Sequence, residues 1–400
     1  MADQRSRSTR DPRLDVLRGL ALFMIFVDHI PNNVLGLATL HNFGFSDAAE
    51  LFVFIAGMSS MLAYGSAFER HGAVAGLSRI VRRWLRLYVF QIGLLLTTLA
   101  VVFGWTRYYG TEPRIVRPFF NAPLSGIMHG LALQAVPTYL DILPLYLALF
   151  AVFPLIYAGL RIAPWLTIVA SAALWGAANI VPSLNLPNWV GSGHWFFNPF
   201  AWQLLFTIGA AVAMNMQAGD SKLPYLRPLA WLSAGYLAFA FVESAPWTAW
   251  HLPDLRPIDI APPNETDLSA LRLLDILAFS YLVFSSAVTR SIANWRIFQP
   301  VALCGRHSLE VFATGCIAAL FGRLLFHTFG GGLWLQLLVN GAGFAVMWAV
   351  GWCLARATSK GGAKAGSVAS LRGSLMRSDI SPRAGARRMA TVPSRVPDWP

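Results

Sequence analysis

Long apolar blocks, most of them close to 20 residues, divide this sequence and decide what it can fold into. We place ten of them, at residues 14–31, 47–66, 84–104, 139–159, 164–181, 200–217, 228–246, 271–289, 300–328 and 333–355. A helix needs about 20 apolar residues to cross a bilayer. Charged residues make up only 12% of the chain, against about 25% in soluble domains. The sequence therefore predicts an all-α polytopic membrane protein with about ten transmembrane helices.

Arginine and lysine are concentrated in alternate loops. They gather in the N-terminal segment, the C-terminal segment, and the loops at 67–83, 160–163, 218–227 and 290–299. By the positive-inside rule these segments face the cytoplasm, so we predict that both termini are cytoplasmic. The alternate loops, at 105–138, 182–199 and 247–270, would then face the periplasm of a bacterial inner membrane. The net charge of +12 is thus attributed to membrane orientation rather than to nucleic-acid binding.

Composition divides the chain into three parts. Residues 1–13 form a cytoplasmic N-terminal segment, 14–355 the membrane domain, and 356–400 a basic cytoplasmic tail that we predict to be disordered. The first block is not followed by a small-residue cleavage site, so we expect an uncleaved helix. The three cysteines have no metal-binding spacing, and we expect neither a metal site nor a tightly bound cofactor. The expected partners include membrane lipids but no nucleic acid.

Ionisable side chains inside apolar blocks are expensive in a bilayer, and so they mark candidate functional sites. In the first block, Arg18 and His29 are eleven residues apart, which places them on one helix face about 16 Å apart along the axis. Asp28 directly precedes the histidine. The alternative is that Arg18 anchors the helix at the headgroups and His29 ends it. We favour a catalytic role for Asp28 and His29.

The second block begins at the level where the first block ends. Asp47 and Glu50 have the spacing of a capping box, which accounts for Asp47. Glu50 could meet Asp28 and His29 in space. A carboxylate beside a histidine orients the ring and stabilises the imidazolium, as a general base acting on a hydroxyl requires. We therefore add Glu50 to the candidate catalytic residues.

A stripe of arginines lies at the start of the third block. Arg79, Arg82, Arg83 and Arg86 follow the i, i+3, i+4, i+7 spacing of one helix face. Guanidinium groups in such a stripe suit a polyanion, for example the phosphates of coenzyme A or of a nucleotide. Anchoring of the helix on its cytoplasmic side produces the same pattern, and the sequence leaves the two open.

Further ionisable residues lie near block ends. Arg306 and Glu310 have an i, i+4 spacing that could neutralise the pair within one helix. We also predict a polar substrate vestibule on the outer side, formed by Asp47, Asp141, Asp275, His307 and Glu310. The aromatic residues that flank this side either stack on sugar rings or form an interfacial belt.

Taken in order along the chain, these residues resemble a known family. Arg18 and His29 match the first-helix pattern of the membrane acyltransferase superfamily called acyltransferase-3, and Arg83-Trp84-Leu85-Arg86 matches its third-helix RxxR pattern. More specifically, the chain resembles the OpgC family, associated with succinylation of osmoregulated periplasmic glucans. The segments that carry this resemblance are Arg13-Leu14-Asp15, Leu17-Arg18-Gly19, Asp28-His29-Ile30-Pro31, Phe43-Gly44-Phe45-Ser46-Asp47-Ala48-Ala49-Glu50, Tyr139-Leu140-Asp141-Ile142-Leu143-Pro144, Asn198-Pro199-Phe200-Ala201-Trp202-Gln203 and Gly305-Arg306-His307-Ser308-Leu309-Glu310.

The resemblance implies a membrane O-acyltransferase. It would move an acyl group from an acyl-CoA, with succinyl-CoA as the expected donor, to hydroxyls of a periplasmic glucan. His29 would be the general base, and the donor would be held by Arg18, Arg82, Arg83 and Arg86. Transfer could be direct or could pass through an acyl-histidine. The alternatives are a proton-coupled transporter or flippase of a glycan or lipid-linked sugar, and a non-catalytic partner of a glucan synthase.

Overall fold

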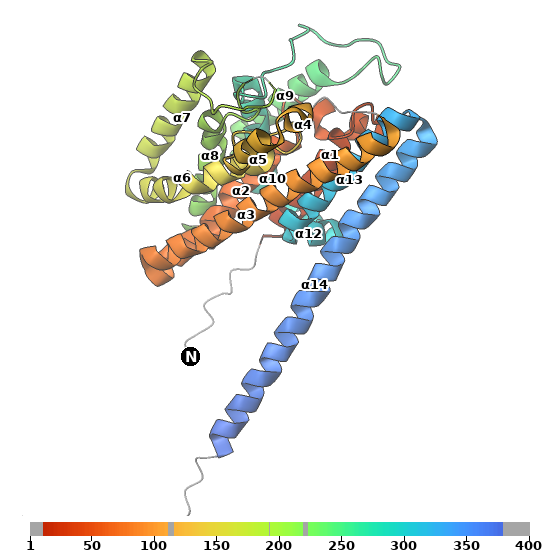
Figure 1. Ribbon diagram of the computed structural model, residues 1–400. Helices are drawn as coiled ribbons and strands as arrows, with labels where there is room; N and C mark the ends of the chain where they lie inside the picture. The colour runs from red at the N-terminus through yellow and green to blue at the C-terminus, as the bar shows by residue number, and fades with distance from the viewer. Residues whose placement is uncertain (1–10, 111–115, 192, 219–222, 379–400) are drawn as a thin grey trace, which may run out of the picture. The chain divides into compact units, whose positions relative to one another are not determined.

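The computed structural model describes residues 11–110, 116–191, 193–218 and 223–378 (Figure 1). The first helices are α1 (Pro12–Asp28), α2 (Ala48–Ser60), α3 (Ser66–Tyr109), α4 (Arg117–Asn121), α5 (Pro123–Leu131), α6 (Ile142–Ile162) and α7 (Pro164–Ile180). They are followed by α8 (Pro199–Ala218), α9 (Arg227–Ser244), α10 (Ala270–Ser285), α11 (Ala287–Ala293), α12 (Gln299–Arg306), α13 (Ser308–Phe329) and α14 (Leu333–Ser378). The chain divides into two compact units, Met1–Trp352 and Cys353–Pro400, which are described separately.

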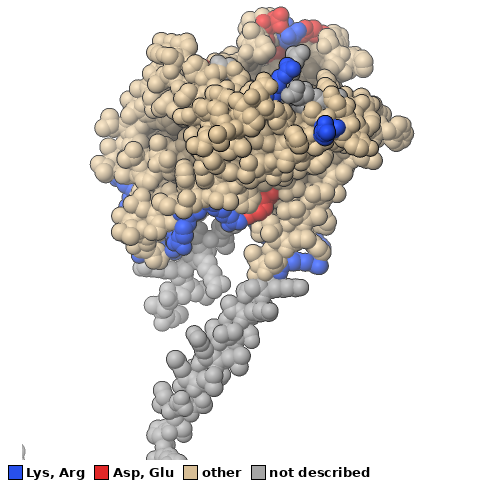
Figure 2. All heavy atoms as spheres, in the orientation of Figure 1, with Lys and Arg blue, Asp and Glu red and all other residues tan. Residues whose placement is uncertain are grey.

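Helix length and composition confirm an all-α membrane protein. Among the described residues, five helices are long and apolar enough to cross a membrane, and a sixth span arises if α10 and α11 are counted together. The predicted count of ten spans and the predicted orientation of the termini are not confirmed. α1 and α7 have 17 residues each, fewer than the length of about 20 expected for a span. Figure 2 shows a broad band without charged side chains between charged groups at two edges, as lipid contact requires.

Three of the predicted block boundaries are wrong. The predicted loop at 67–83 is helical except at Gly72, whose φ of 80° and ψ of 177° interrupt α3. The predicted span at 271–289 bends by 82° between α10 and α11, because Ser286 leaves the helix and caps α11 by accepting from the Val288 N–H. The predicted span at 300–328 breaks at the non-helical His307, between α12 and α13.

Backbone contact fixes the helices that carry the candidate site. Where α1 crosses α12, a Cβ atom on Gly19 would lie 2.1 Å from the carbonyl oxygen of Val301. Where α2 crosses α8, a Cβ atom on Gly57 would lie 2.1 Å from the carbonyl oxygen of Phe206. Helices in a bilayer associate largely through close packing, which small residues permit. α1 and α2 are therefore held against α12 and α8 with no room for a larger side chain.

Arg13, assigned by sequence to the cytoplasmic segment 1–13, is buried against the end of α10 and is 2% exposed. Its Nη1 donates to the carbonyl oxygens of Val283, Phe284 and Ser286, and its Nη2 pairs with Asp11 at 2.7 Å. The last carbonyls of a helix lack intrahelical donors and carry partial negative charge, so a guanidinium satisfies them. The folded membrane domain thus begins before residue 14.

The second unit contains the end of α14. The sequence predicts a disordered tail from residue 356, whereas the structure continues the helix to Ser378. Once a helix is nucleated, each further residue adds a hydrogen bond without a new nucleation step, so a span can extend beyond its apolar block. The remainder of the predicted tail, 379–400, lies outside the described residues, as do residues 1–10 of the N-terminal segment.

We predict that Gly72→Ala destabilises the protein, since the backbone conformation of Gly72 is accessible almost only to glycine and strain there is of order 1–3 kcal/mol. Gly93→Ala is the matched control, because Gly93 is helical within the same α3 and a Cβ atom there meets nothing within 4 Å. Thermal unfolding in lipid nanodiscs measures both. The prediction fails if the two variants unfold at the same temperature.

Candidate functional site

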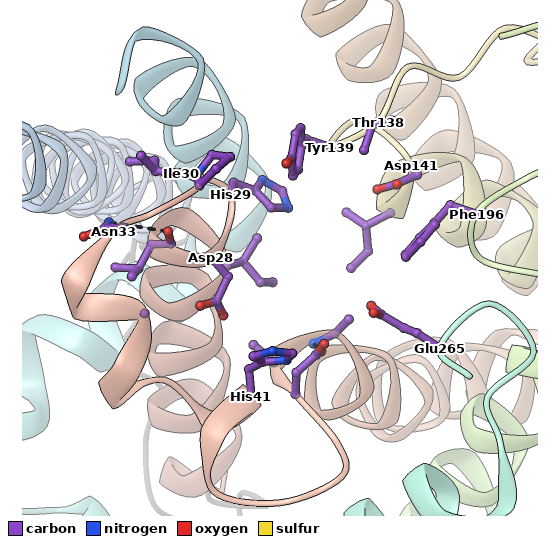
Figure 3. Close-up of a pocket in the computed structure, with 18 of the residues that line it drawn as sticks. Asp28, His29, Ile30, Asn33, His41, Thr138, Tyr139, Asp141, Phe196 and Glu265 are labelled. Atoms are coloured by element: carbon purple, nitrogen blue, oxygen red, sulfur yellow. Dashed lines mark hydrogen bonds between the residues drawn. The ribbon is translucent and has the colours of Figure 1, made fainter. Parts of the chain in front are cut away.

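His29 follows the last residue of α1 and lines a cavity of about 370 Å³, which we call the His29 cavity. Figure 3 shows its imidazole facing a space that Asp141, Phe196 and Glu265 border on the far side. The cavity is built from helix ends and the segments beside them. Its acidic and histidine lining residues, among those that the structure describes, are Asp28, His29, His41, Asp47, Asp141 and Glu265. The predicted residues Asp28, His29, Asp47 and Asp141 are thus brought together.

An arginine and a tyrosine hold His29 in place. The Tyr139 ring lies 5.0 Å from the imidazole between ring centroids. Arg323, on α13, donates from Nη1 to the His29 carbonyl oxygen at 2.9 Å, and its guanidinium lies 4.3 Å from the centre of the Tyr139 ring. Arg323 is not among the residues predicted from the sequence, although an arginine inside an apolar block is itself a signal of function. These contacts fix the backbone and the ring of His29 from two other elements.

Glu50 is not a partner of His29. It is completely buried, it does not line the His29 cavity, and its Oε1 accepts from Arg272 Nε at 2.6 Å. Its other oxygen accepts from the Asp47 backbone N–H, which confirms the predicted capping box. The prediction that Glu50 orients His29 is wrong because Arg272, itself 4% exposed, is a buried cation that requires this carboxylate.

Arg272 connects three of the acidic residues around the His29 cavity. Besides Glu50, its Nη2 lies 3.0 Å from Asp47 and 3.7 Å from Glu265. Burial, together with the nearby Asp47 carboxylate, raises the pKa of Glu265 above its usual range. A carboxyl group with a raised pKa holds its proton more readily and can donate a hydrogen bond to a ligand.

The remaining carboxylates have partners of their own. Asp28 accepts from the Thr39 hydroxyl at 2.7 Å. Asp275, predicted to line the vestibule, instead accepts from the backbone N–H and the hydroxyl of Ser46, which holds the chain in place before α2. Among the described residues, no carboxylate forms a hydrogen bond with the His29 imidazole. Asp28, Asp141 and Glu265 face the space into which the imidazole points (Figure 3).

A second cavity, of about 140 Å³, contains Arg18 and is called here the Arg18 cavity. Arg18 donates to the hydroxyl of Ser59 and to the carbonyl oxygen of Gly305. Of the predicted arginine stripe, Arg83 also lines this cavity. Arg82 is exposed and donates to the Ser78 carbonyl oxygen of its own helix. The lining is otherwise made of hydroxyl-bearing and apolar side chains from α2, the short helical segment Met61–Gly65 that follows it, α3, α6 and α13.

Two residues predicted for the vestibule lie away from the His29 cavity. Glu310 pairs with Arg86 of the stripe, and His307 precedes Ser308, which lines the Arg18 cavity. The expected pairing of Arg306 with Glu310 is wrong, because the helix breaks at His307 between them. Arg306 pairs instead with Asp15 of α1, with 3.3 Å between Nε and Oδ2.

Comparison with known proteins gives one match. The model of the family described as OpgC protein matches residues 10–359, which is most of the chain. No curated protein and no solved structure matches it.

We predict that Arg272→Met lowers the free energy of unfolding by about 3–5 kcal/mol, since Glu50 remains buried without its cation. A second substitution, Glu50→Met, should restore much of this loss because it removes the uncompensated charge. Arg256→Met is the matched control, because Arg256 pairs with Asp254 and Asp259 on an exposed loop, where ion pairs contribute little. Thermal unfolding of the three variants in nanodiscs measures the effect. Equal stability of the Arg272 and Arg256 variants would contradict it.

Proposed function

The chain belongs to the OpgC family, and on that premise we propose that it is a membrane O-acyltransferase that transfers a succinyl group from succinyl-CoA to hydroxyls of a periplasmic glucan. The family is one of glucan-modifying transferases, and the apolar helices are those of a multi-pass membrane protein. The proposal adds the donor, the acceptor, the inner-membrane location and the role of His29.

The observation that carries the proposal is the arrangement of two cavities along one helix. Arg18 lines one cavity from within α1, and His29 lines the other just after the same helix ends. The eleven residues between them correspond to about 16 Å of helix, a distance that an extended pantetheine arm can bridge. A donor bound near Arg18 could therefore present its thioester toward His29 while its phosphates stay on the Arg18 side.

His29 is suited to the role of general base in this transfer. The acceptor hydroxyl oxygen attacks the thioester carbonyl carbon, and His29 takes the hydroxyl proton. A carbon–oxygen bond forms, the carbon–sulfur bond breaks, and its electron pair leaves with sulfur as the thiolate of coenzyme A. The imidazolium then returns its proton to the thiolate, which gives the ester and free coenzyme A. Arg323 donates to the His29 carbonyl oxygen and so holds the residue in position for this step.

The other lining residues suit a sugar acceptor. Carboxylate oxygens accept hydrogen bonds from hydroxyl groups, and Asp28, Asp141 and Glu265 present them toward the space that His29 faces (Figure 3). The aromatic side chains of Tyr139, Phe196 and Phe197 add apolar surface to the same cavity. This combination of acceptors and apolar faces is characteristic of small-molecule sites with a few convergent polar groups.

We predict that His29→Ala lowers kcat by about 10²- to 10⁴-fold, the usual contribution of a general base. His71→Ala is the matched control, since His71 is exposed on α3 and lines neither cavity, and we expect its kcat to change less than about threefold. Purified protein in nanodiscs is given succinyl-CoA and linear glucan, and the assay follows released thiol and ester mass. A folded His29→Ala variant with wild-type kcat would contradict the catalytic assignment. Glycan flux through proteoliposomes without any acyl-CoA would favour the transporter alternative.

We predict that Arg323→Met lowers kcat by about 10- to 100-fold with little change in KM for either substrate, because it releases His29 from its position. Arg323→Lys should recover only part of this loss, since lysine keeps the charge but cannot stack a planar group on Tyr139. Arg161→Met is the control, because Arg161 forms an exposed pair with Glu69. A change confined to KM would show that Arg323 does not position the catalytic group.

A further inference from the structure

An aromatic layer lies between the two cavities. It consists of Phe52 on α2, Tyr146 on α6 and Phe312 on α13, all three of them buried. The Phe52 ring lies 5.5 Å from the Tyr146 ring and 6.2 Å from the Phe312 ring between centroids, and the last pair is nearly parallel. The Tyr146 hydroxyl donates to the Phe52 carbonyl oxygen at 2.8 Å, so its polar end is occupied within the layer.

The position of this layer follows from the lining residues of α2 and α6. On α2, Ala48 and Ala49 line the His29 cavity, and Phe52, one turn further on, lines the Arg18 cavity. On α6, Ile142 lines the His29 cavity, whereas Leu143 and Tyr146 line the Arg18 cavity. The rings of Phe52 and Tyr146, with Leu143, therefore lie at the end of the Arg18 cavity that is nearer the His29 cavity.

The residues next to Phe52 on the same face of α2 are small. Ala49 lies three residues before it and Ala56 four residues after it. Opening of the layer would require Phe52 to change its χ1 rotamer, and alanine is the neighbour that obstructs such a change least.

We propose that Phe52, Tyr146 and Phe312 form a gate that admits the acyl arm of the donor to the His29 cavity and is otherwise closed. This inference rests on the proposed function, because the purpose of the gate is to favour acyl transfer to the acceptor over hydrolysis of the donor. In hydrolysis, water replaces the acceptor hydroxyl: its oxygen bonds to the thioester carbon, the carbon–sulfur bond breaks, and the free acid and the thiol are released. An apolar layer that fits closely around the arm keeps bulk water from the thioester.

Access to a thiol introduced into the His29 cavity tests the gate without any catalysis. The Ala49→Cys substitution places this thiol, and the exposed Cys353 is replaced by serine, while Cys304 and Cys316 are buried. The probe is trimethylammonium-ethyl methanethiosulfonate, a small impermeant cation, applied to inside-out membrane vesicles from the predicted cytoplasmic face. The same protein without Ala49→Cys gives the background reaction.

With Phe52 intact we expect slow labelling of the introduced thiol from this face and rapid labelling from the opposite face. Phe52→Ala should raise the rate from the predicted cytoplasmic face at least about tenfold, because the layer loses its central ring. Phe52→Leu, which better preserves the packing, should raise it less but in the same direction. Phe153→Ala is the matched control, since Phe153 is a buried phenylalanine of the same helix α6 that lines neither cavity.

Rapid labelling from the predicted cytoplasmic face with Phe52 intact, or equal labelling rates in the folded Phe52→Ala and Phe153→Ala variants, would overturn the gate. Hydrolysis of succinyl-CoA without acceptor gives a second measurement on the same proteins, and its rate should rise in Phe52→Ala and not in Phe153→Ala. If the labelling rates follow these expectations but the wild-type protein turns over no acyl-CoA, the proposed function is overturned and the gate is retained. Labelling and hydrolysis that rise together support both.

Discussion

One buried cation, Arg272, determines how the His29 cavity is assembled. It lies in the first turn of α10 and pairs with Glu50 and Asp47, which are also the two residues of the capping box that begins α2. The same two carboxylates thus accept hydrogen bonds at the N-terminus of α2 and pair with the guanidinium of Arg272. Arg272 lies 222 residues after Glu50 in the chain. A buried ion pair of this kind adds little net stability against apolar substitutes, but removal of one partner is costly. Formation of these ion pairs therefore positions three segments jointly: the start of α2, the start of α10 and the segment that contains Glu265.

The second constraint is the bilayer, which leaves ionisable groups only where other parts of the chain satisfy them. Arg13 is placed against the carbonyls at the end of α10, Asp275 against Ser46, and Arg323 against the carbonyl of His29. Each of these contacts joins segments that are far apart in the sequence. Because hydrophobic burial gives helices little preference for one another in lipid, such polar contacts and close glycine crossings define which helices meet. Of these three contacts, the one made by Arg323 reaches a residue that lines the His29 cavity.

This also explains which parts of the molecule the sequence could predict. The spacing of Arg18 and His29 on α1 and the capping box of Asp47 and Glu50 are local patterns, and local geometry fixes them. The partner of Glu50 could not be read from the sequence, since any buried cation on another helix competes for it. The pairing of Arg306 with Glu310 failed for a related reason: an i, i+4 rule assumes a continuous helix, and His307 interrupts it. The helix break at Gly72 could not be predicted either, because a single glycine within a helical pattern is tolerated more often than it breaks the helix.

The two cavities differ in charge, and this difference gives the proposed transfer a direction. Guanidinium groups of Arg18 and Arg83 line one cavity, whereas carboxyl groups line the other without any arginine or lysine among its described lining residues. The phosphates of a coenzyme A donor would be attracted to the first cavity, while the hydroxyl groups of a sugar can form hydrogen bonds among the carboxyl groups of the second. In the proposed transfer the phosphates would therefore stay near Arg18 while the pantetheine arm reaches toward His29. The two linings would thus keep donor and acceptor apart at the two ends of α1, and no carboxylate among the described residues forms a hydrogen bond with the His29 imidazole.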